Sequence, residues 1–329
     1  MSMLGFLIIS IAMLAQDLVL PSAKKKEYYS DGFLISASRY DYSPAARQMV
    51  GSASSAYDKA RAIYEWLTEN VDYDPTGQIR TADACWEQRK GVCQGYCELY
   101  YRLAETVGLK VKLVYGNAKN AVDPSQYEKH VWLSVTTEKG DILMDPTWGA
   151  GFMVKGKFVR QPKPLMWFDT NPCWMIFTHM PQKHKHQHLP NEVSEADFAR
   201  LPYLHPLAAK LGIAPREALA QSLAGADALP VIPVLNSDFL DRVVLSSVPL
   251  TRHLTLGRTY IFSIDKRQTE CTVAIDHEGA TIPEEQWRVN GKNYSVMVTP
   301  QHKGRLQLIV ATPHPYFPTR KVVLEYVVE

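Results

Sequence analysis

The sequence predicts an α+β protein in which helices pack on an antiparallel sheet, with a β-sandwich at the C-terminal end. Helical patterns occupy residues 45–71 and 93–107, and strand patterns follow them between residues 110 and 145. A run of helices followed by a run of strands favours an α+β domain. A later series of short β-rich segments, beginning at residue 243, predicts the sandwich.

The two helical patterns have different ends. Apolar residues recur near helical spacing over residues 45–71, before the turn residues Pro75, Thr76 and Gly77. Residues 93–107 carry a broad apolar stripe, and Gly108 follows at the position where glycine commonly ends helices. We therefore expect two amphipathic helices, the second of which starts just after Gly91.

The strand patterns that follow are short and divided by turn signals. We expect strands at residues 110–115, 130–135 and 141–145, with the turn residues Glu138, Lys139 and Gly140 between the last two. Together with the two helices they predict one α+β domain.

The remainder of the chain divides at an expected linker in residues 224–233, which are rich in alanine, glycine and proline. Before it we expect short helices near residues 195–201 and 216–223. After it the β-rich runs predict a sandwich of immunoglobulin size. The runs lie at residues 243–245, 259–264, 272–275, 294–298, 306–310 and 322–327. We therefore expect one α+β domain with a C-terminal extension at residues 23–225 and a β-sandwich at residues 226–329.

The N-terminal residues 1–22 are expected to be a signal peptide. The uncharged apolar run Leu4–Leu14 is shorter than the roughly 20 residues that span a bilayer, and Ala15 suits a cleavage site. No lysine or arginine precedes the run, and Met13 is large for its position, so a buried or interfacial helix is the alternative. Removal of a signal peptide would leave an exported protein, periplasmic or extracellular, with no transmembrane segment.

Composition excludes some classes of partner and scaffold. The 36 basic and 34 acidic residues are spread along the chain, so no basic block predicts a nucleic-acid surface. The five cysteines are too few and too scattered for a disulfide scaffold, and their odd number leaves at least one free thiol in a single chain.

Cys93 is the thiol that the pattern singles out. It stands between Gly91 and Gly95 at the expected start of a helix, where the helix dipole and unpaired backbone N–H groups favour the thiolate. The same N–H groups can stabilise an oxyanion, and we expect the small glycines to let a substrate backbone approach.

His130 and Asp145 are candidates for the base and for the group that orients it. Histidine holds and returns a proton near neutral pH. If the two strands form a hairpin with an even-numbered loop, residues 130 and 145 share one face of the sheet. They are directly opposite if the turn centres on Thr137 and Glu138, and diagonal neighbours if it lies slightly later.

Each residue also has a plainer interpretation. A single buried cysteine is usually inert, a histidine at a strand start is commonly a surface residue, and aspartate before proline is commonly a turn residue. Spacing alone therefore leaves the reactive and the structural interpretations open.

The ordered motifs resemble those of the transglutaminase-like superfamily. Residues 89–96, Arg-Lys-Gly-Val-Cys-Gln-Gly-Tyr, resemble its nucleophile motif, and His130 before Val131-Trp132 and Asp145 before Pro146-Thr147 follow in its order. Further similarity to the kyphoscoliosis peptidase branch is carried by short motifs on both sides of these three. They are Glu65-Trp66-Leu67, Val71–Asp74, Gly116–Lys119, Trp148–Gly151, His179-Met180-Pro181 and Phe198–Tyr203.

This resemblance implies a papain-like core with a Cys93-His130-Asp145 triad and an acyl-enzyme mechanism that uses neither metal nor cofactor. It implies a peptide or protein substrate, with cell-wall peptide as one candidate, and favours hydrolysis over transamidation. The alternative is a catalytically silent scaffold of the same fold that binds a peptide. The oligomeric state is not predicted.

Other candidate residues have weaker patterns. Cys97 lies four residues after Cys93, but without zinc spacing or a second ligand pair the two do not predict a metal site. His184, His186 and His188 are expected in a mobile polar loop. Gln88 is a candidate oxyanion donor or a solvated glutamine. Trp132 and Trp148 are candidates for cleft walls or for core packing; they stand beside the proposed histidine and aspartate.

Overall fold

The structure is a computed structural model, and the residues it describes form two compact units. They are residues 28–30, 33–121, 123–161, 164–225, 229–230, 243–267, 270–312 and 319–329. The first unit comprises 1–116 with 129–169, and the second 117–128 with 170–329, each to the extent described. The expected signal peptide and most of the expected linker lie outside the described residues, and the expected domain boundaries stay predictions. Within the described part of the chain, no helix is both long enough and apolar enough to cross a membrane.

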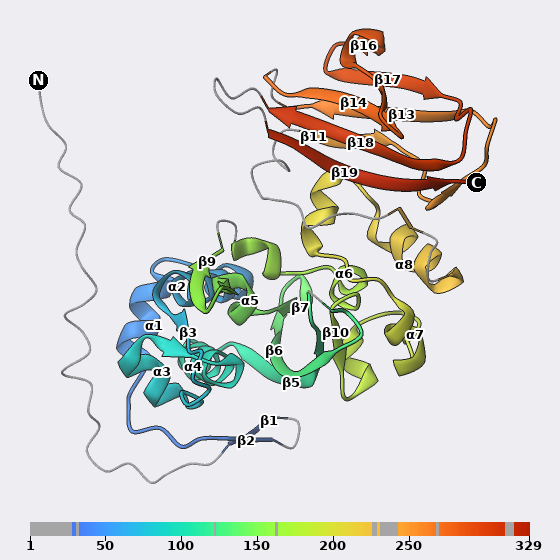
Figure 1. The fold of residues 1–329 in the computed structure, drawn as a ribbon. Helices are drawn as coiled ribbons and strands as arrows, with labels where there is room; N and C mark the ends of the chain where they lie inside the picture. The colour runs from blue at the N-terminus through green and yellow to red at the C-terminus, as the bar shows by residue number, and fades with distance from the viewer. Residues whose placement is uncertain are drawn as a thin grey trace, which may run out of the picture. The chain divides into compact units, whose positions relative to one another are not determined.

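Four helices of the first unit pack together beside its strands (Figure 1). They are α1 (Ser43–Val50), α2 (Ala56–Asn70), α3 (Ala82–Gln88) and α4 (Cys93–Thr106). The predicted helix at 93–107 is confirmed as α4, and Gly108 follows it at φ 81°. Tyr96, Leu99, Tyr100 and Leu103 on its apolar stripe are fully buried.

The prediction of one helix over residues 45–71 was wrong, because this segment is broken into α1 and α2. Gly51 ends α1 at φ 53°, a backbone conformation that favours glycine. The Ser55 side chain then accepts a hydrogen bond from the Asp58 N–H at 3.0 Å and begins α2. Helix α3 was not predicted, although Thr81 caps it by accepting from the Ala84 N–H at 3.3 Å.

The sheet that positions the candidate site has the strand order β10–β5–β6–β7. Its strands are β5 (Lys110–Lys119), β6 (Tyr127–Thr137), β7 (Gly140–Met144) and β10 (His179–Pro181). The predicted strands at 110–115, 130–135 and 141–145 are confirmed as parts of β5, β6 and β7. Thr137 pairs with Gly140 and Leu133 with Met144, so β6 and β7 form an antiparallel hairpin with a two-residue turn.

Among the described residues, three smaller sheets have two strands each. In the first unit β1 (Tyr28–Ser30) pairs with β2 (Phe33–Ile35), and β3 (Asp72–Tyr73) pairs with β4 (Lys90–Gly91). Helix α5 (Pro146–Ala150) follows β7 and leads into the hairpin of β8 (Gly151–Val154) and β9 (Lys157–Arg160). The 3-10 helix η2 (Pro164–Trp167) ends this part of the unit.

The second unit contains short helices before its β-rich part. They are α6 (Pro172–Met175), η3 (His184–Gln187), α7 (Glu195–Arg200), η4 (Pro206–Leu211) and α8 (Pro215–Ala224). The predicted short helices near 195–201 and 216–223 are confirmed as α7 and α8.

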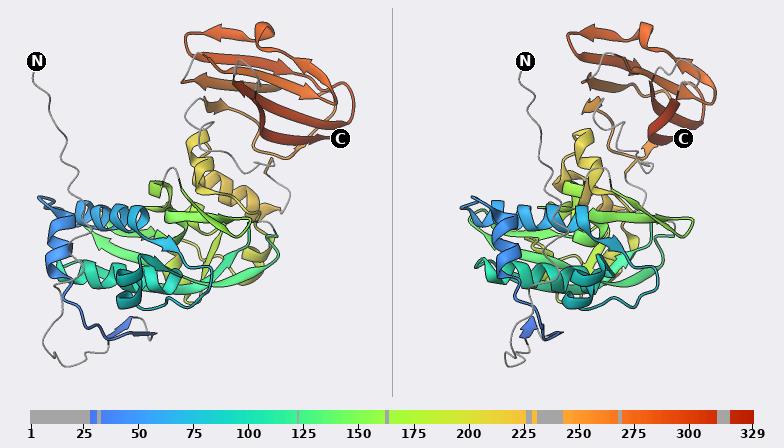
Figure 2. Two further views of the ribbon diagram at one scale, coloured as in Figure 1. Left: turned by 60° about the vertical axis from the view of Figure 1, so that its left-hand side comes forward. Right: turned by 90° about the vertical axis from the view of Figure 1, so that its left-hand side faces the viewer.

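The C-terminal strands form two sheets, which Figures 1 and 2 show in orange and red. One has the order β11 (Val243–Ser247), β13 (Tyr260–Lys266), β17 (Asn293–Val298), β16 (Arg288–Asn290). The other has the order β12 (His253–Leu254), β19 (Thr319–Val328), β18 (Gly304–Thr312), β14 (Thr272–His277), β15 (Ala280–Ile282), with η5 (Glu284–Gln286) beside β14.

The two C-terminal sheets meet through buried aromatic side chains. Phe262 of β13 and Tyr326 of β19 are fully buried, with ring centroids 5.6 Å apart in an edge-to-face contact. Each predicted β-rich run coincides with a strand of one of these sheets. The predicted α+β fold followed by a β-sandwich is therefore confirmed.

Candidate functional site

Cys93 is the first residue of α4, as the sequence predicts. Val92 precedes it in extended conformation and provides no side-chain cap, so the first turn of α4 keeps its N–H groups for other acceptors. The expectation that the flanking glycines admit a substrate was wrong for both. A Cβ atom would lie 2.9 Å from the Cys85 Sγ at Gly91 and 2.9 Å from the Ile79 carbonyl oxygen at Gly95, so both glycines allow close packing inside the protein.

Asp145 follows β7 and begins α5. Its Oδ1 accepts hydrogen bonds from the Thr147 N–H at 2.8 Å and the Trp148 N–H at 3.0 Å, which caps the helix. Its own N–H donates to the Trp167 carbonyl at 2.9 Å. The side chain is fully buried, so the helix end fixes its direction.

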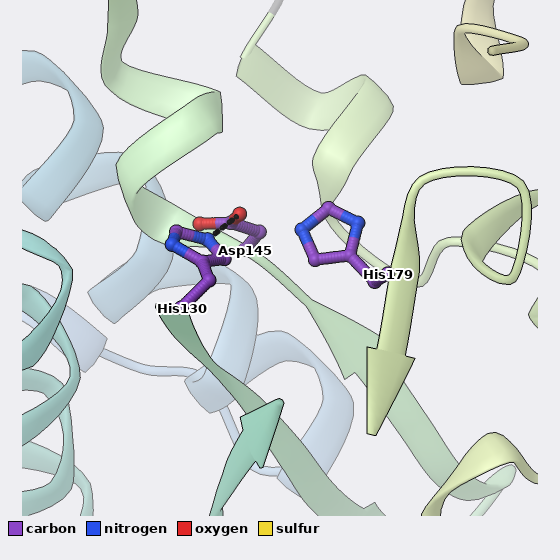
Figure 3. Close-up of side chains that lie close together, drawn as sticks. All are labelled: His130, Asp145 and His179. Carbon is purple, nitrogen blue, oxygen red and sulfur yellow. Dashed lines mark hydrogen bonds and ion pairs between the residues drawn. The ribbon is translucent and has the colours of Figure 1, made fainter. Parts of the chain in front are cut away.

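His130 and Asp145 are in direct contact, as Figure 3 shows. The His130 Nε2 and the Asp145 Oδ2 are 2.7 Å apart. The β6–β7 turn lies at Glu138 and Lys139, one position later than direct opposition requires, so the two residues are diagonal neighbours. The predicted parity and the diagonal alternative are both confirmed. Figure 3 also draws His179, a residue of β10 in the second unit.

The electrostatics of this group couple Cys93 to His130. Burial acts to raise the pKa of the Cys93 thiol, but a hydrogen bond with His130 and the charge of that ring lower it below its ordinary value. Burial acts to lower the pKa of His130, but Asp145, through its charge and its hydrogen bond, raises it above the ordinary value. Because Nε2 is engaged by Asp145, Nδ1 is the ring nitrogen that can meet the thiol.

Aromatic side chains surround the imidazole. The Trp132 ring stacks on His130 with centroids 6.2 Å apart, and the Trp148 ring is tilted at 5.6 Å. Trp148 in turn meets Trp167 edge to face at 5.0 Å. Trp132 is buried and Trp148 only partly so, which makes Trp132 a packing residue and Trp148 a partly accessible wall.

Tyr64 and Gly149 were not among the predicted site residues. The Tyr64 hydroxyl donates to the Asp145 carbonyl at 3.4 Å, and a Cβ atom at Gly149 would lie 1.9 Å from that hydroxyl oxygen. Only glycine fits where α2 meets α5. The available signal was the position of Tyr64 on the apolar face of its helix, with Ala60 and Leu67.

The weaker candidates lie away from this chemistry. Gln88 is exposed at the end of α3, as expected of a solvated glutamine. Cys97 is fully buried with its Sγ 3.4 Å from the Val131 carbonyl, and burial raises its pKa. The histidine-rich segment is not a polar loop as expected. It forms η3, in which buried Gln187 exchanges hydrogen bonds with the Val193 backbone at 2.8 and 2.7 Å.

Part of this chain is similar to a known family of domains. Residues 43–146 match the model of the transglutaminase-like superfamily. They carry a transglutaminase-like domain. The range includes α1 to α4, the β6–β7 hairpin and Asp145, so the resemblance found in the ordered motifs is confirmed.

Relatives of the transglutaminase-like domain include two animal proteins. The Lim and transglutaminase domain protein ltd-1 of Caenorhabditis elegans is 25% identical over 218 residues, covering 57% of this chain and 30% of that protein. The mouse kyphoscoliosis peptidase is 26% identical over 175 residues, covering 47% of this chain and 25% of that protein. The matches thus span less than a third of either relative's length. They support the predicted branch as well as the superfamily.

Among solved structures, red sea bream transglutaminase matches 93% of this chain and 62% of its own chain. The sequence identity is 10% and the TM-score is 0.28.

Proposed function

We propose that this chain is a cysteine enzyme that forms an acyl-enzyme on Cys93 with amide or peptide substrates. The observation that carries the proposal is the 2.7 Å contact between buried His130 and buried Asp145, beside a thiol whose pKa His130 lowers. A pairing of this kind favours thiolate and imidazolium together, which is the reactive form of a cysteine nucleophile.

In the proposed acylation step, the Cys93 thiolate attacks the carbonyl carbon of the substrate. A C–S bond forms, and the oxygen becomes an oxyanion beside the N–H groups at the start of α4. His130 gives its proton to the departing amine as the C–N bond breaks, which leaves a thioester on Cys93 and a neutral imidazole. Asp145 keeps the ring in place throughout.

In the proposed second step, water attacks the thioester and His130 takes one of its protons. The C–S bond breaks, the carboxylic acid leaves, and the thiolate and imidazolium are restored. An amine in place of water would give transamidation through the same acyl-enzyme. The name of the kyphoscoliosis peptidase relatives supports hydrolysis as the proposed outcome.

The place and substrate of this activity are also proposals. The apolar run of residues 4–14 supports export, and an exported enzyme would meet extracellular protein or cell-wall peptide.

The test is the reactivity of Cys93 and its capture of an acyl group. We expect iodoacetamide to alkylate Cys93 faster than Cys173, a buried cysteine of the second unit. Incubation with a peptide library should leave an acyl adduct on Cys93 that mass spectrometry identifies. Cys93→Ala should abolish turnover, while Cys173→Ala should retain it.

Two outcomes would contradict this proposal. Equal alkylation of Cys93 and Cys173 would remove the basis for a nucleophile. If the folded wild-type protein bound peptide and formed no acyl adduct, the result would instead support the catalytically silent scaffold.

A further inference from the structure

A pocket of about 360 Å³ is lined by residues of α1, α2 and α3 in the first unit. The lining residues of α2 stand at helical spacing and so share one face of that helix. They are Ala62, Glu65, Trp66 and Glu69. Helix α3 contributes Trp86. The volume is in the range of sites that bind small molecules, and no lining residue takes part in the proposed mechanism.

Two tryptophans form part of the pocket wall. Trp66 and Trp86 are 7% and 2% exposed, and their rings stack with centroids 5.3 Å apart. The Arg89 guanidinium, which is not part of the lining, lies 4.7 Å from the Trp66 centroid and 4.2 Å from the Trp86 centroid. Indole faces attract cations, but the charge of Arg89 opposes a second one. A further cation therefore needs negative charge beside these rings.

Glu65 and Glu69 supply that negative charge, and the lining contains no lysine, arginine or histidine. The two are four residues apart on α2, where like charges repel and destabilise a helix. Arg61 pairs with Glu65 at 3.0 Å, but both side chains are exposed, and exposed pairs of this kind contribute little. Glu69 has no ion-pair partner among the described residues. A cation bound in the pocket would relieve the repulsion between the two carboxylates.

We infer that this pocket binds an arginine side chain of a peptide or protein partner. The flat guanidinium would stack on an indole and donate hydrogen bonds to the carboxylates, two interactions that arginine combines better than lysine. Its aliphatic stem would pack against the small side chains of Ala45 and Ala62, which also line the pocket. This binding involves neither Cys93 nor turnover, so the inference does not depend on the proposed function.

The test uses Cys93→Ala, so that no chemistry at the thiol complicates binding, and the peptide acetyl-Gly-Arg-Gly-amide as the probe. NMR follows the indole N–H signals of Trp66 and Trp86. We expect both signals to shift with one dissociation constant, on the order of a few millimolar for a single side chain. The peptide with citrulline in place of arginine keeps the shape but not the charge, and should bind about tenfold more weakly. The peptide with lysine should bind about threefold more weakly.

Three variants of the same protein locate the site. Glu69→Gln should raise the dissociation constant about threefold, while the melting temperature stays the same or rises because the repulsion on α2 is removed. Ala62→Met keeps a good helix former and fills the pocket, so it should abolish measurable binding. Glu195→Gln is the matched control, since Glu195 of α7 is exposed and lies in the second unit. It should leave the dissociation constant unchanged.

Four outcomes would overturn this inference. They are equal affinity for the arginine and citrulline peptides, equal affinity for the arginine and lysine peptides, unaltered affinity in both Glu69→Gln and Ala62→Met, and binding that shifts neither indole signal. Failure of the proposed function would show separately, in the wild type, as alkylation of Cys93 no faster than that of Cys173. The two can therefore fail independently.

Discussion

The candidate site in the first unit and the β-sandwich in the second bury different kinds of side chain. Around α4 and α5, Asp145, Glu98 and His130 are 0%, 2% and 9% exposed. The sandwich interior is instead built on apolar side chains such as Phe262 and Leu308, both fully buried. Burial of an ionisable group lowers the stability of the fold unless the group is paired, whereas burial of an apolar side chain stabilises the fold. The two regions therefore differ in the chemistry of what they bury, and among the described residues only the first buries a carboxylate in contact with a histidine beside a cysteine.

An ion pair among the described residues of the sandwich makes this contrast more specific. The Lys266 Nζ lies 2.8 Å from a Glu284 oxygen, and the other Glu284 oxygen accepts from the Val273 N–H at 2.8 Å. The Glu284 carboxylate of η5 thus links Lys266 of one sheet to the Val273 backbone of the other. In the candidate site, His130 bonds to Asp145 and also lowers the pKa of the Cys93 thiol, and this coupling to a thiol makes the pair a candidate for function.

Asp145→Asn should have the largest effect, and on activity. Asparagine keeps an oxygen to cap α5 but removes the charge beside His130, so we expect turnover to fall about a thousandfold or more. In the wild type Asp145 raises the pKa of His130, and activity is lost as pH rises through that pKa. In the variant this alkaline limb should move to lower pH, as measured by kcat/KM against pH.

The melting temperature of Asp145→Asn serves as its control. Asp145 would have a role in folding alone if activity fell, the melting temperature dropped strongly and the alkaline limb of the pH profile stayed in place. That result would remove the distinction drawn between the two regions.

Phe262→Ala should have the next largest effect, and on stability. It empties a buried position against Tyr326 and should lower the free energy of unfolding by about 3–5 kcal/mol, as measured by chemical denaturation. Alkylation of Cys93 should proceed at the wild-type rate under folding conditions.

Met297→Ala is the matched control for the sandwich, because Met297 of β17 is 72% exposed. It should change the free energy of unfolding by less than about 0.5 kcal/mol. If the folded Phe262→Ala protein lost Cys93 reactivity, the packing of the sandwich and the reactivity of Cys93 would not be independent of each other.

Gly149→Ala should have the smallest effect of the three and should involve both properties. The added Cβ would meet the Tyr64 hydroxyl at 1.9 Å, so α5 or Tyr64 must shift, at a cost of about 1–3 kcal/mol. Because α5 begins at Asp145, alkylation of Cys93 should also slow.

Two variants check the steric reason for Gly149→Ala. Tyr64→Phe in the same chain should restore part of the stability, because the closest atom is then removed. Gly225→Ala, where nothing lies within 4 Å, should be neutral within about 0.5 kcal/mol. Equal losses of stability at both glycines would contradict a clash with Tyr64 as the cause.

The parts of the fold that the sequence predicted well depend on neighbouring residues. The start of α4 at Cys93 and its end before Gly108 follow from the apolar stripe and a glycine. The shared face of His130 and Asp145 follows from a two-residue turn between adjacent strands. In each case the determining interactions are local, so periodicity and turn residues were sufficient.

The missed features depend on residues far apart in the chain. Tyr64 reaches the Asp145 carbonyl across 81 residues, and Ser36 reaches Glu98 across 62. No local pattern marks such pairs, because burial and hydrogen bonding are settled only by tertiary packing. The break between α1 and α2 was different, because local residues do mark it. Gly51 ends α1 and Ser55 caps α2, but the apolar periodicity continues across both and predicted a single helix.

The two oxygens of Asp145 bind different partners, so local unfolding at one of them would affect the other. One oxygen holds the first turn of α5 and the other holds the imidazole of His130. A fluctuation that frays this five-residue helix would release the carboxylate, and the ring would lose its orientation while the rest of the unit stayed folded. Hydrogen exchange at the amides of Thr147 and Trp148 would therefore report the fraction of molecules whose imidazole is held in place.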